Sequence, residues 1–331
     1  MNSNILKQIN FRSIETSAPC RIDMGGTLDI PTFHYPLSRL KPCTFNVALD
    51  LRTRVKLLPN NNRKVKITSR GFAVSEYTVH EAPFNHPLGL MFAIAAYFGA
   101  EGVHITIDSS SPPKSALGGS SVAAIALIAA FLKASGQQKI SKTEQRYQIA
   151  QLAHKLEESV AGVPCGMQDQ LAAVFGGINA WHWLPTERGV KLNRESLSDK
   201  PHLKDFKRHL LLAYCGIPHE SKHINSTWVD QFITGKHRNC WVEIVSCTKA
   251  FVAALKRPNY KAAVVAMNRE TAIRREMTPE VLDRIGVKLV ESAIETHCGA
   301  RFTGAGGGGC VWALGSIRDI DRLRTKWEVI L

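Results

Sequence analysis

The chain has 331 residues, and its 42 Lys and Arg against 28 Asp and Glu give a formal net charge of +14. Hydrophobic residues at 44% and charged residues at 21% are typical of a folded globular chain and exclude a disordered one. The longest uncharged apolar stretch, Val122 to Leu132, is too short to cross a bilayer, and the N-terminal region has no signal-peptide pattern. We therefore expect a soluble, cytoplasmic protein of about two domains with no membrane partner.

The first half of the chain mixes strands with helices. Apolar residues that alternate with polar ones, or that cluster between turn residues, predict four strands, at 13–20, 44–57, 103–108 and 177–183. A helical repeat of apolar residues predicts helices at 86–97, 118–134 and 141–160, and a short helix that ends at Phe175 follows the turn at 162–166. We also expect residues 65–68 to pair with the second strand as a hairpin, and Ser141 with Glu144 to form a capping box.

Helices dominate the second half. The polar stretch 185–207 is the best candidate for a linker, and it divides the chain into domains 1–185 and 186–331. Beyond it we predict strands at 209–214 and 310–314, with four helices between them, at 221–233, 239–256, 260–276 and 279–298. These elements predict an α+β protein of two packed domains.

The most informative segment is 111–124, with the sequence SPPKSALGGSSVAA. A strand ends at Asp108, a proline-rich loop follows, and residues 118–121 open a long apolar helix. The first turn of a helix presents unpaired N–H groups, and glycines let an oxygen-bearing ligand approach the backbone. The segment is therefore a candidate phosphate-binding loop, and the alternative is an ordinary turn with a serine N-cap. It matches neither a Walker A loop nor a nucleophile elbow.

A second glycine-rich run, at 304–309, contains a formal GxGxxG pattern. It leads directly into a predicted strand, so we expect no βαβ unit and no dinucleotide site here. Five glycines in six residues require a backbone that passes close to something. The neighbour is either a ligand or a tightly packed element of the protein itself.

Four charged positions are further candidates. Glu157 lies near a predicted helix C-terminus, where the helix dipole disfavours acids, so it invites a cation such as Mg²⁺; the alternative is a solvated helix end. Asp169 follows a glycine-rich turn and is either functional or a helix cap. Arg21 and Asp29 flank two glycines at a strand end, where the alternative is an ordinary salt bridge.

Three motifs together resemble those of the GHMP kinase superfamily of small-molecule kinases, in the same order. Segment 112–123 resembles the family's central PxxxGLGSSA motif, 302–310 its C-terminal glycine motif, and 18–29 its N-terminal motif. Segment 162–177 resembles galactokinases and heptose-phosphate kinases, in which the attacked hydroxyl is at C1 of the sugar. The resemblance implies an ATP-dependent sugar kinase with a ribosomal-protein-like N-terminal domain and a ferredoxin-like α/β C-terminal domain.

The resemblance also implies a role for each matching residue. Asp169 corresponds to the catalytic aspartate, Arg21 to the basic residue beside it, and Ser120 with Glu157 to the Mg²⁺ site. The residues that correspond to the ATP-binding loop are Leu117, Gly118, Gly119, Ser120 and Ser121. Those that correspond to the site for a sugar or sugar phosphate are Asp29, Gly304, Gly306 and Gly307.

The chain also departs from the family pattern. Ala116 stands where the family usually has glycine, and the N-terminal motif is one residue shorter than in galactokinases and lacks their Glu-His pair, which disfavours galactose. The rival interpretation is an RNA-binding protein or a non-catalytic member of the same fold, because the positive charge suits RNA. However, the Lys and Arg residues are spread along the chain with few aromatic residues between them, which disfavours nucleic acid.

Overall fold

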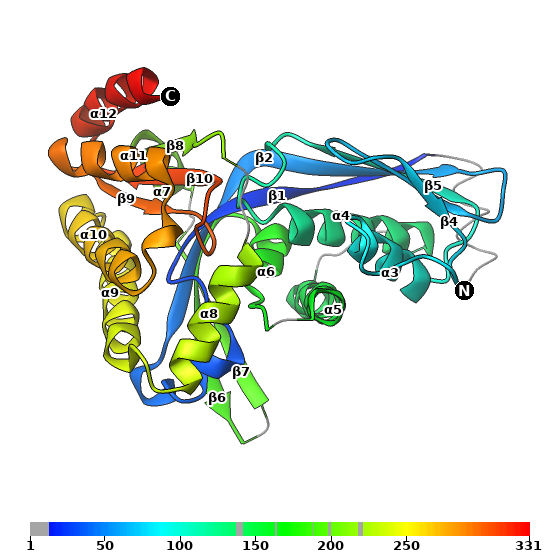
Figure 1. The fold of residues 1–331 in the computed structure, drawn as a ribbon, viewed down its shortest axis with the longest axis horizontal. Helices are drawn as coiled ribbons and strands as arrows, with labels where there is room; N and C mark the ends of the chain where they lie inside the picture. Colours follow the sequence, from blue (N-terminus) through cyan, green and yellow to red (C-terminus); the bar gives the residue numbers. More distant parts are fainter. Residues whose placement is uncertain (1–12, 137–141, 163, 188, 198–199, 218–220) are drawn as a thin grey trace.

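The computed structural model describes residues 13–136, 142–162, 164–187, 189–197, 200–217 and 221–331. Two sheets organise this part of the chain: a seven-stranded sheet with helices on one face, and a three-stranded sheet flanked by helices (Figure 1). The long strands β1 (Ile14–Met24) and β2 (Cys43–Pro59) run from the first group of elements into the second. The prediction of an α+β protein is therefore confirmed.

Strand β2 is the centre of the larger sheet. One of its edges pairs with β1 along most of its length. Its other edge is divided between two strands, because β5 (Val103–Ser109) pairs with the C-terminal half of β2 and β6 (Ile178–Thr186) with the N-terminal end. The sheet therefore changes partner in the middle of β2.

Strand β1 is irregular at the same level, where its pairing register with β2 shifts between Pro19 and Arg21. There the backbone N–H of Arg21 donates to the carbonyl of Leu117 (3.1 Å), in the loop that precedes α4 (Gly119–Ala134). This hydrogen bond attaches β1, at the position of Arg21, to the candidate phosphate-binding loop.

Four helices cover one face of the large sheet: α3 (Gly89–Tyr97), α4, α5 (Thr143–Ala161) and α6 (Gln168–Phe175) (Figure 1). Helix α4 is the central one and contacts β1 and β2 as well as the other three helices. Because it is covered on all sides, it is apolar all round rather than amphipathic. Its N-terminus is the polar end.

The smaller sheet is antiparallel, with the strand order β8-β10-β9. Its strands are β8 (Leu210–Tyr214), β9 (Gly299–Phe302) and β10 (Cys310–Leu314). The helices of this half are α7 (Lys200–Arg208), α8 (Ser221–Ile233), α9 (Arg238–Lys256), α10 (Tyr260–Met277), α11 (Arg284–Glu295) and α12 (Ile317–Ile330).

The two halves share a continuous hydrophobic core. Phe45 of β2 contacts Phe251 of α9, with ring centroids 5.1 Å apart, and Phe251 contacts Trp312 of β10 at 6.1 Å. All three side chains are fully buried. This aromatic contact holds β10 and the glycine loop before it against the large sheet.

Two predicted features are wrong. Residues 65–68 do not form a hairpin with the second strand, because β1, β5 and β6 already occupy the two edges of β2; β3 (Val65–Ser69) instead pairs in parallel with β5 and antiparallel with β4 (Ser75–Tyr77). The stretch 185–207 is not a linker, because it contains β7 (Gly189–Ser196) and α7. Strand β7 pairs only with β6 among the described strands and stays largely polar, which made it resemble a linker.

Several smaller elements were not predicted. These are α2 (Pro31–His34), two 3₁₀ turns at Ser38–Leu40 and Pro279–Val281, and the elements β4, β9 and α12. The predicted helix 279–298 is interrupted, because Asp283 caps a new helix at Gly286 N–H (2.7 Å). Ser141 of the predicted capping box lies outside the described residues.

The predicted boundary between the two domains stays a prediction, and the sheet suggests a different position for it. Residue 185 lies inside β6, which pairs with β7, so a boundary there would cut a hairpin of the large sheet. We therefore propose that the N-terminal domain extends through Ser196 of β7.

None of the described helices combines the length and apolar character needed to cross a bilayer.

Candidate active site

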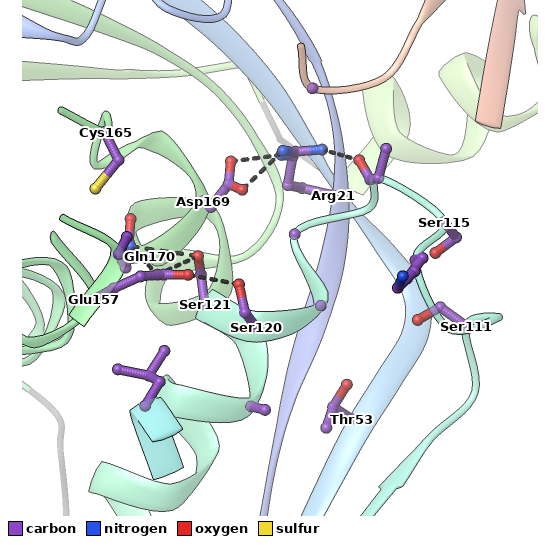
Figure 2. Close-up of a pocket in the computed structure, with 18 of the residues that line it drawn as sticks. Arg21, Thr53, Ser111, Ser115, Ser120, Ser121, Glu157, Cys165, Asp169 and Gln170 are labelled. Atoms are coloured by element: carbon purple, nitrogen blue, oxygen red, sulfur yellow. Dashed lines mark hydrogen bonds and ion pairs between the residues drawn. The ribbon is translucent and has the colours of Figure 1, made fainter. Parts of the chain in front are cut away.

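A cavity of about 460 Å³ lies where β1, the 111–118 loop and the N-termini of α4 and α6 meet (Figure 2). Both halves of the chain line it, since Asn225 of α8 and the residues Gly304 and Ala305 of the glycine loop contribute to its wall. The predicted site residues that line it are Arg21, Asp29, Gly118, Gly119, Ser120, Ser121, Glu157, Asp169 and Gly304. Arg21 and Asp169, which are 148 positions apart in the sequence, are thereby brought together.

The N-terminus of α4 faces this cavity. Gly118 adopts a left-handed conformation (φ 77°), and its carbonyl accepts the first helical hydrogen bond from Val122 N–H (2.9 Å). No side chain caps the first turn of this helix. A Cβ at Gly119 would meet no atom within 4 Å, so the space in front of this backbone is open. The free N–H groups of the first turn and the helix dipole favour an anion there.

The loop before the helix is strained. Lys114 and Ala116 have positive φ angles of 54° and 60°, a conformation that costs a residue with a Cβ about 1–2 kcal/mol. This explains why a glycine would suit position 116. Leu117, a predicted site residue, does not line the cavity: its side chain is buried in the core, and its carbonyl accepts the N–H of Arg21.

Glu157 is held at the end of α5 by neutral donors (Figure 2). Its Oε1 accepts from Ser120 Oγ (2.5 Å), and its Oε2 accepts from Ser121 Oγ (2.6 Å) and Gln170 Nε2 (2.7 Å). Burial raises the pKa of Glu157, because none of these groups supplies a compensating positive charge. A half-buried carboxylate next to two hydroxyl oxygens is a donor set that fits Mg²⁺, which binds few protein carboxylates together with phosphate oxygens.

Asp169 and Arg21 form a bidentate ion pair beside the helix N-terminus (Figure 2). Arg21 donates from Nε to Oδ1 (2.7 Å) and from Nη2 to Oδ2 (2.8 Å) of Asp169, and its Nη1 donates to the carbonyl of Ala116 (2.7 Å). Burial disfavours the charged guanidinium, but Asp169 and Asp23 outweigh this and raise the pKa of Arg21. A Cβ at Gly118 would lie 3.1 Å from Asp169 Oδ2, so the carboxylate directly adjoins the candidate phosphate-binding loop.

Asp29 is a buried carboxylate at the cavity wall. Its Oδ2 accepts the backbone N–H of Gln168 (2.9 Å), which ties it to the start of α6. A Cβ at Gly166 would overlap its carboxylate, so this glycine is needed for close approach. Burial, together with the nearby negative charge of Asp169, raises the pKa of Asp29 to about 6 despite the hydrogen bond from Gln168.

The glycine loop divides into a cavity-lining part and a packing part. Gly304 lines the cavity, and a Cβ there would lie 3.4 Å from Arg21 Nη2. Gly306 packs against the backbone of Val281, and Gly307 N–H donates to the carbonyl of Val281 (3.0 Å). Neither Gly306 nor Gly307 lines the cavity, so their role as substrate residues stays a prediction and tight packing accounts for them.

The site also contains polar residues that were not selected from the sequence. Gln168, Gln170 and Asn225 line the cavity, and each has a buried amide oxygen without a hydrogen-bond partner among the described residues. Gln168 and Gln170 flank Asp169, so their position next to a candidate residue was a usable signal. Asn225 is on α8, and only the fold brings it to the cavity.

These features define an α+β fold in which a helix N-terminus and an Asp–Arg pair share one cavity, which is the arrangement that the GHMP kinase resemblance implies. Residues 85–177 match the family model of the GHMP kinases N terminal domain. The chain is 27% identical over 299 residues to the mevalonate kinase of Thermococcus onnurineus, in an alignment that covers 81% of each chain. It is 25% identical over 335 residues to the galactokinase of Staphylococcus carnosus, in an alignment that covers 85% of this chain and 83% of the galactokinase.

The fold agrees with this. The structure of Lactococcus lactis galactokinase complexed with galactose superimposes with a TM-score of 0.71 at 18% identity, over 96% of this chain and 89% of the other. Residues 85–177 therefore form a GHMP kinases N terminal domain, and the chain has mevalonate kinase and galactokinase among its relatives.

Gly119→Ala tests the phosphate-binding loop without disturbing the fold. Because the new methyl group meets no protein atom, the free energy of unfolding should stay the same or rise, since Ala favours a helix over Gly by up to about 1 kcal/mol. The methyl group enters the space assigned to the phosphates, so the KM for ATP should rise at least about tenfold, by about 1.4 kcal/mol. An unchanged KM for ATP in the folded variant would remove this helix end from the nucleotide site.

Asp29→Asn should stabilise the protein. A folded-state pKa of about 6 instead of 3.8 means that the fold prefers the protonated acid, so stability is highest below about pH 4 and falls by about 3 kcal/mol as the pH rises past 6. We expect Asp29→Asn to remove most of this fall in urea unfolding between about pH 4 and 7, while the exposed control Asp50→Asn does not. A wild-type stability that is flat over this range contradicts the assignment.

Proposed function

We propose that the protein transfers the γ-phosphoryl group of ATP to a sugar hydroxyl, with the anomeric hydroxyl at C1 as the acceptor. One observation carries this proposal: the Asp169 carboxylate adjoins Gly118 at the open N-terminus of α4, and both line the same cavity. Backbone N–H groups that can bind phosphates and a carboxylate that can accept a proton therefore border the same cavity, which can hold a small substrate.

The first turn of α4 supports binding of the phosphates of ATP through its free N–H groups. Ser120 and Glu157 are the residues that would hold Mg²⁺, with Ser121 and Gln170 orienting the Glu157 carboxylate. Bound there, Mg²⁺ supplies positive charge against the β- and γ-phosphates. The residues of the chain supply the geometry.

Asp169 is the group assigned to the acceptor hydroxyl. The hydroxyl oxygen attacks the γ-phosphorus, the bond from phosphorus to the ADP oxygen breaks, and the hydroxyl proton passes to Asp169. Arg21 holds both carboxylate oxygens, so the carboxylate is oriented before substrate binds. Because phosphoryl transfer has a loose transition state, orientation contributes more than base strength.

The choice of a sugar is supported by the polar groups at the acceptor end of the cavity. Asp29 and Asp169 are anions there, and they favour hydroxyl donors over the carboxylate that a mevalonate-like acceptor would carry. The amide groups of Gln168 and Asn225 add hydrogen-bonding capacity that several hydroxyls of one polyol can satisfy. The match to both mevalonate kinase and galactokinase makes this choice a matter for experiment.

An ADP-release assay across hexoses, deoxyhexoses, heptoses, their phosphates and mevalonate tests this function. We expect ATP turnover with at least one free or phosphorylated sugar and a product phosphorylated at C1, identified by its loss of reducing character. Turnover with mevalonate alone would contradict the sugar assignment. RNA retention without acceptor-dependent ADP release would favour the RNA-binding alternative.

Asp169→Asn should lower kcat by about 10²–10⁴-fold, the range typical of a general base, with a much smaller change in the KM for ATP. The asparagine keeps the shape of the side chain but accepts the proton poorly and loses the charge that pairs with Arg21. Circular dichroism at the assay temperature checks the fold. Near-normal kcat in a folded variant would remove Asp169 from the reaction.

Glu157→Gln should raise the Mg²⁺ concentration for half-maximal rate at least about tenfold, because it removes the carboxylate charge. Glu158→Gln is the matched control, because the side chain of Glu158 is 43% exposed and its Oε2 lies 4.0 Å from His154 Nε2 instead of at the serines. Because burial raises the pKa of Glu157, protons should compete with Mg²⁺ in the wild type as the pH falls, and this competition should weaken in Glu157→Gln. Equal Mg²⁺ titrations in the two variants would relocate the metal site.

A further inference from the structure

Asp23 is a buried carboxylate that the proposed mechanism does not use. It lies two residues after Arg21 on β1 and is fully buried. Its Oδ1 accepts the backbone N–H of Gly304 (2.7 Å) and lies 3.4 Å from Arg21 Nη1. Its Oδ2 accepts from Arg301 Nη1 (3.1 Å). One carboxylate therefore contacts the arginine of the candidate site, the glycine loop and the small sheet.

Asp23 is part of a longer buried chain of charges. Arg301 on β9 donates from Nε to Glu270 Oε2 (2.8 Å) on α10, and the other oxygen of Glu270 accepts from Arg274. Arg274 Nη2 in turn donates to the carbonyl of Gly26 (2.7 Å), in the loop after β1. The side chains of Arg301, Glu270 and Arg274 are all 0% exposed.

The charges along this chain alternate in sign. In order they are Asp169, Arg21, Asp23, Arg301, Glu270 and Arg274, with three anions and three cations. Burial opposes ionisation of Glu270, but Arg274 and Arg301 outweigh it and lower the pKa of Glu270. The chain begins at the candidate catalytic carboxylate on α6 and crosses into the C-terminal half of the molecule.

A buried chain of charges adds little net stability to a fold. Taking charges out of water costs several kcal/mol per ion, and well-packed apolar residues often stabilise a core as well or better. What an alternating chain supplies is defined geometry, because each charge must stay next to its partners. The alternating buried charges therefore indicate that this chain holds neighbouring segments in a fixed position.

The contacts of the glycine loop indicate what is positioned. Backbone hydrogen bonds fix its packing part: Gly307 N–H donates to Val281 (3.0 Å), Gly309 N–H donates to Ile217 (2.9 Å), and Cys215 N–H donates to Gly309 (2.8 Å). Gly304, at the cavity-lining end of the loop, is held instead by the side chain of Asp23. The oxygen that accepts from Gly304 is the one that lies next to Arg21.

We propose that Asp23 is a positioning residue for phosphoryl transfer, which sets the Gly304 end of the glycine loop in register with the Arg21–Asp169 pair. Its two contacts couple a wall of the cavity contributed by the C-terminal half to a carboxylate contributed by the N-terminal half. This inference rests on the proposed kinase function for its kinetic consequence, although the tether itself is independent of activity.

Asp23→Asn is the test variant, and Glu270→Gln is its matched control. Each removes one anion from the same chain, but Glu270 contacts neither Gly304 nor Arg21 in the hydrogen bonds and ion pairs of the described residues. Every partner of the Asp23 carboxylate is a donor, so an asparagine must turn its NH₂ group toward a donor and release one contact. If Asp23→Asn does not fold, the double variant Asp23→Asn with Arg301→Gln restores the charge balance and still lacks the tether.

Two measurements are made on each folded variant. Amide hydrogen exchange over residues 302–309 should be faster in Asp23→Asn than in the wild type and unchanged in Glu270→Gln. With an acceptor sugar, kcat of Asp23→Asn should fall about 10²-fold, the effect of a misplacement of about 1 Å, while the KM for ATP changes little. Glu270→Gln should keep kcat close to the wild-type value after correction for the folded fraction.

The outcomes separate the two proposals. Equal loop exchange in Asp23→Asn and the wild type overturns the tether, whatever the activity. Faster exchange with unchanged kcat, or an equal loss of kcat in both variants, overturns the positioning role. Faster exchange in a protein that phosphorylates no acceptor in the screen supports the tether and contradicts the proposed function instead.

Discussion

The site depends on one buried guanidinium. Arg21 has almost no exposed surface, and its donors are directed at the carboxylate of Asp169, the carbonyl of Ala116 and the carboxylate of Asp23. An unpaired charge in this position would cost several kcal/mol, so the loop, the strand and the start of α6 must all be in place at once. Arg21 therefore links the fold to the chemistry: a chain that folds correctly has its candidate catalytic carboxylate already oriented.

Several other residues at the cavity are also held in states that the fold alone disfavours. Asp29 is an acid whose ionisation the fold disfavours, Glu157 is an anion held by neutral groups, and Ala116 adopts a conformation that suits glycine. Each reduces the stability of the empty protein, and each lies at the wall of one cavity. Costs of this kind persist where binding a substrate or cation repays them. Their clustering at the cavity is itself an argument for function.

The sequence predicted the parts of the site that depend on local patterns. The glycines and serines before an apolar helix, the acids near the ends of α5 and α6, and the ordered motifs pointed to residues that the fold brings together, as with Ser120 and Glu157 (2.5 Å). What it missed depends on long-range pairing. Nothing local indicates that β3 pairs with β5, or that Asp23 and Arg301 are in contact across 278 positions. The polar strand β7 resembled a linker because a strand at the outer side of a sheet need not be apolar.

The proposed function requires the nucleotide phosphates to bind at the N-terminus of α4, with the acceptor between them and Asp169. A crystal structure with Mg²⁺ and a non-hydrolysable ATP analogue tests it most directly. We expect the β- and γ-phosphates against the N–H groups of residues 119–121, with the γ-phosphate close enough to Asp169 for one hydroxyl oxygen to bridge them. Phosphates bound elsewhere, or a γ-phosphate directed away from Asp169, would contradict it.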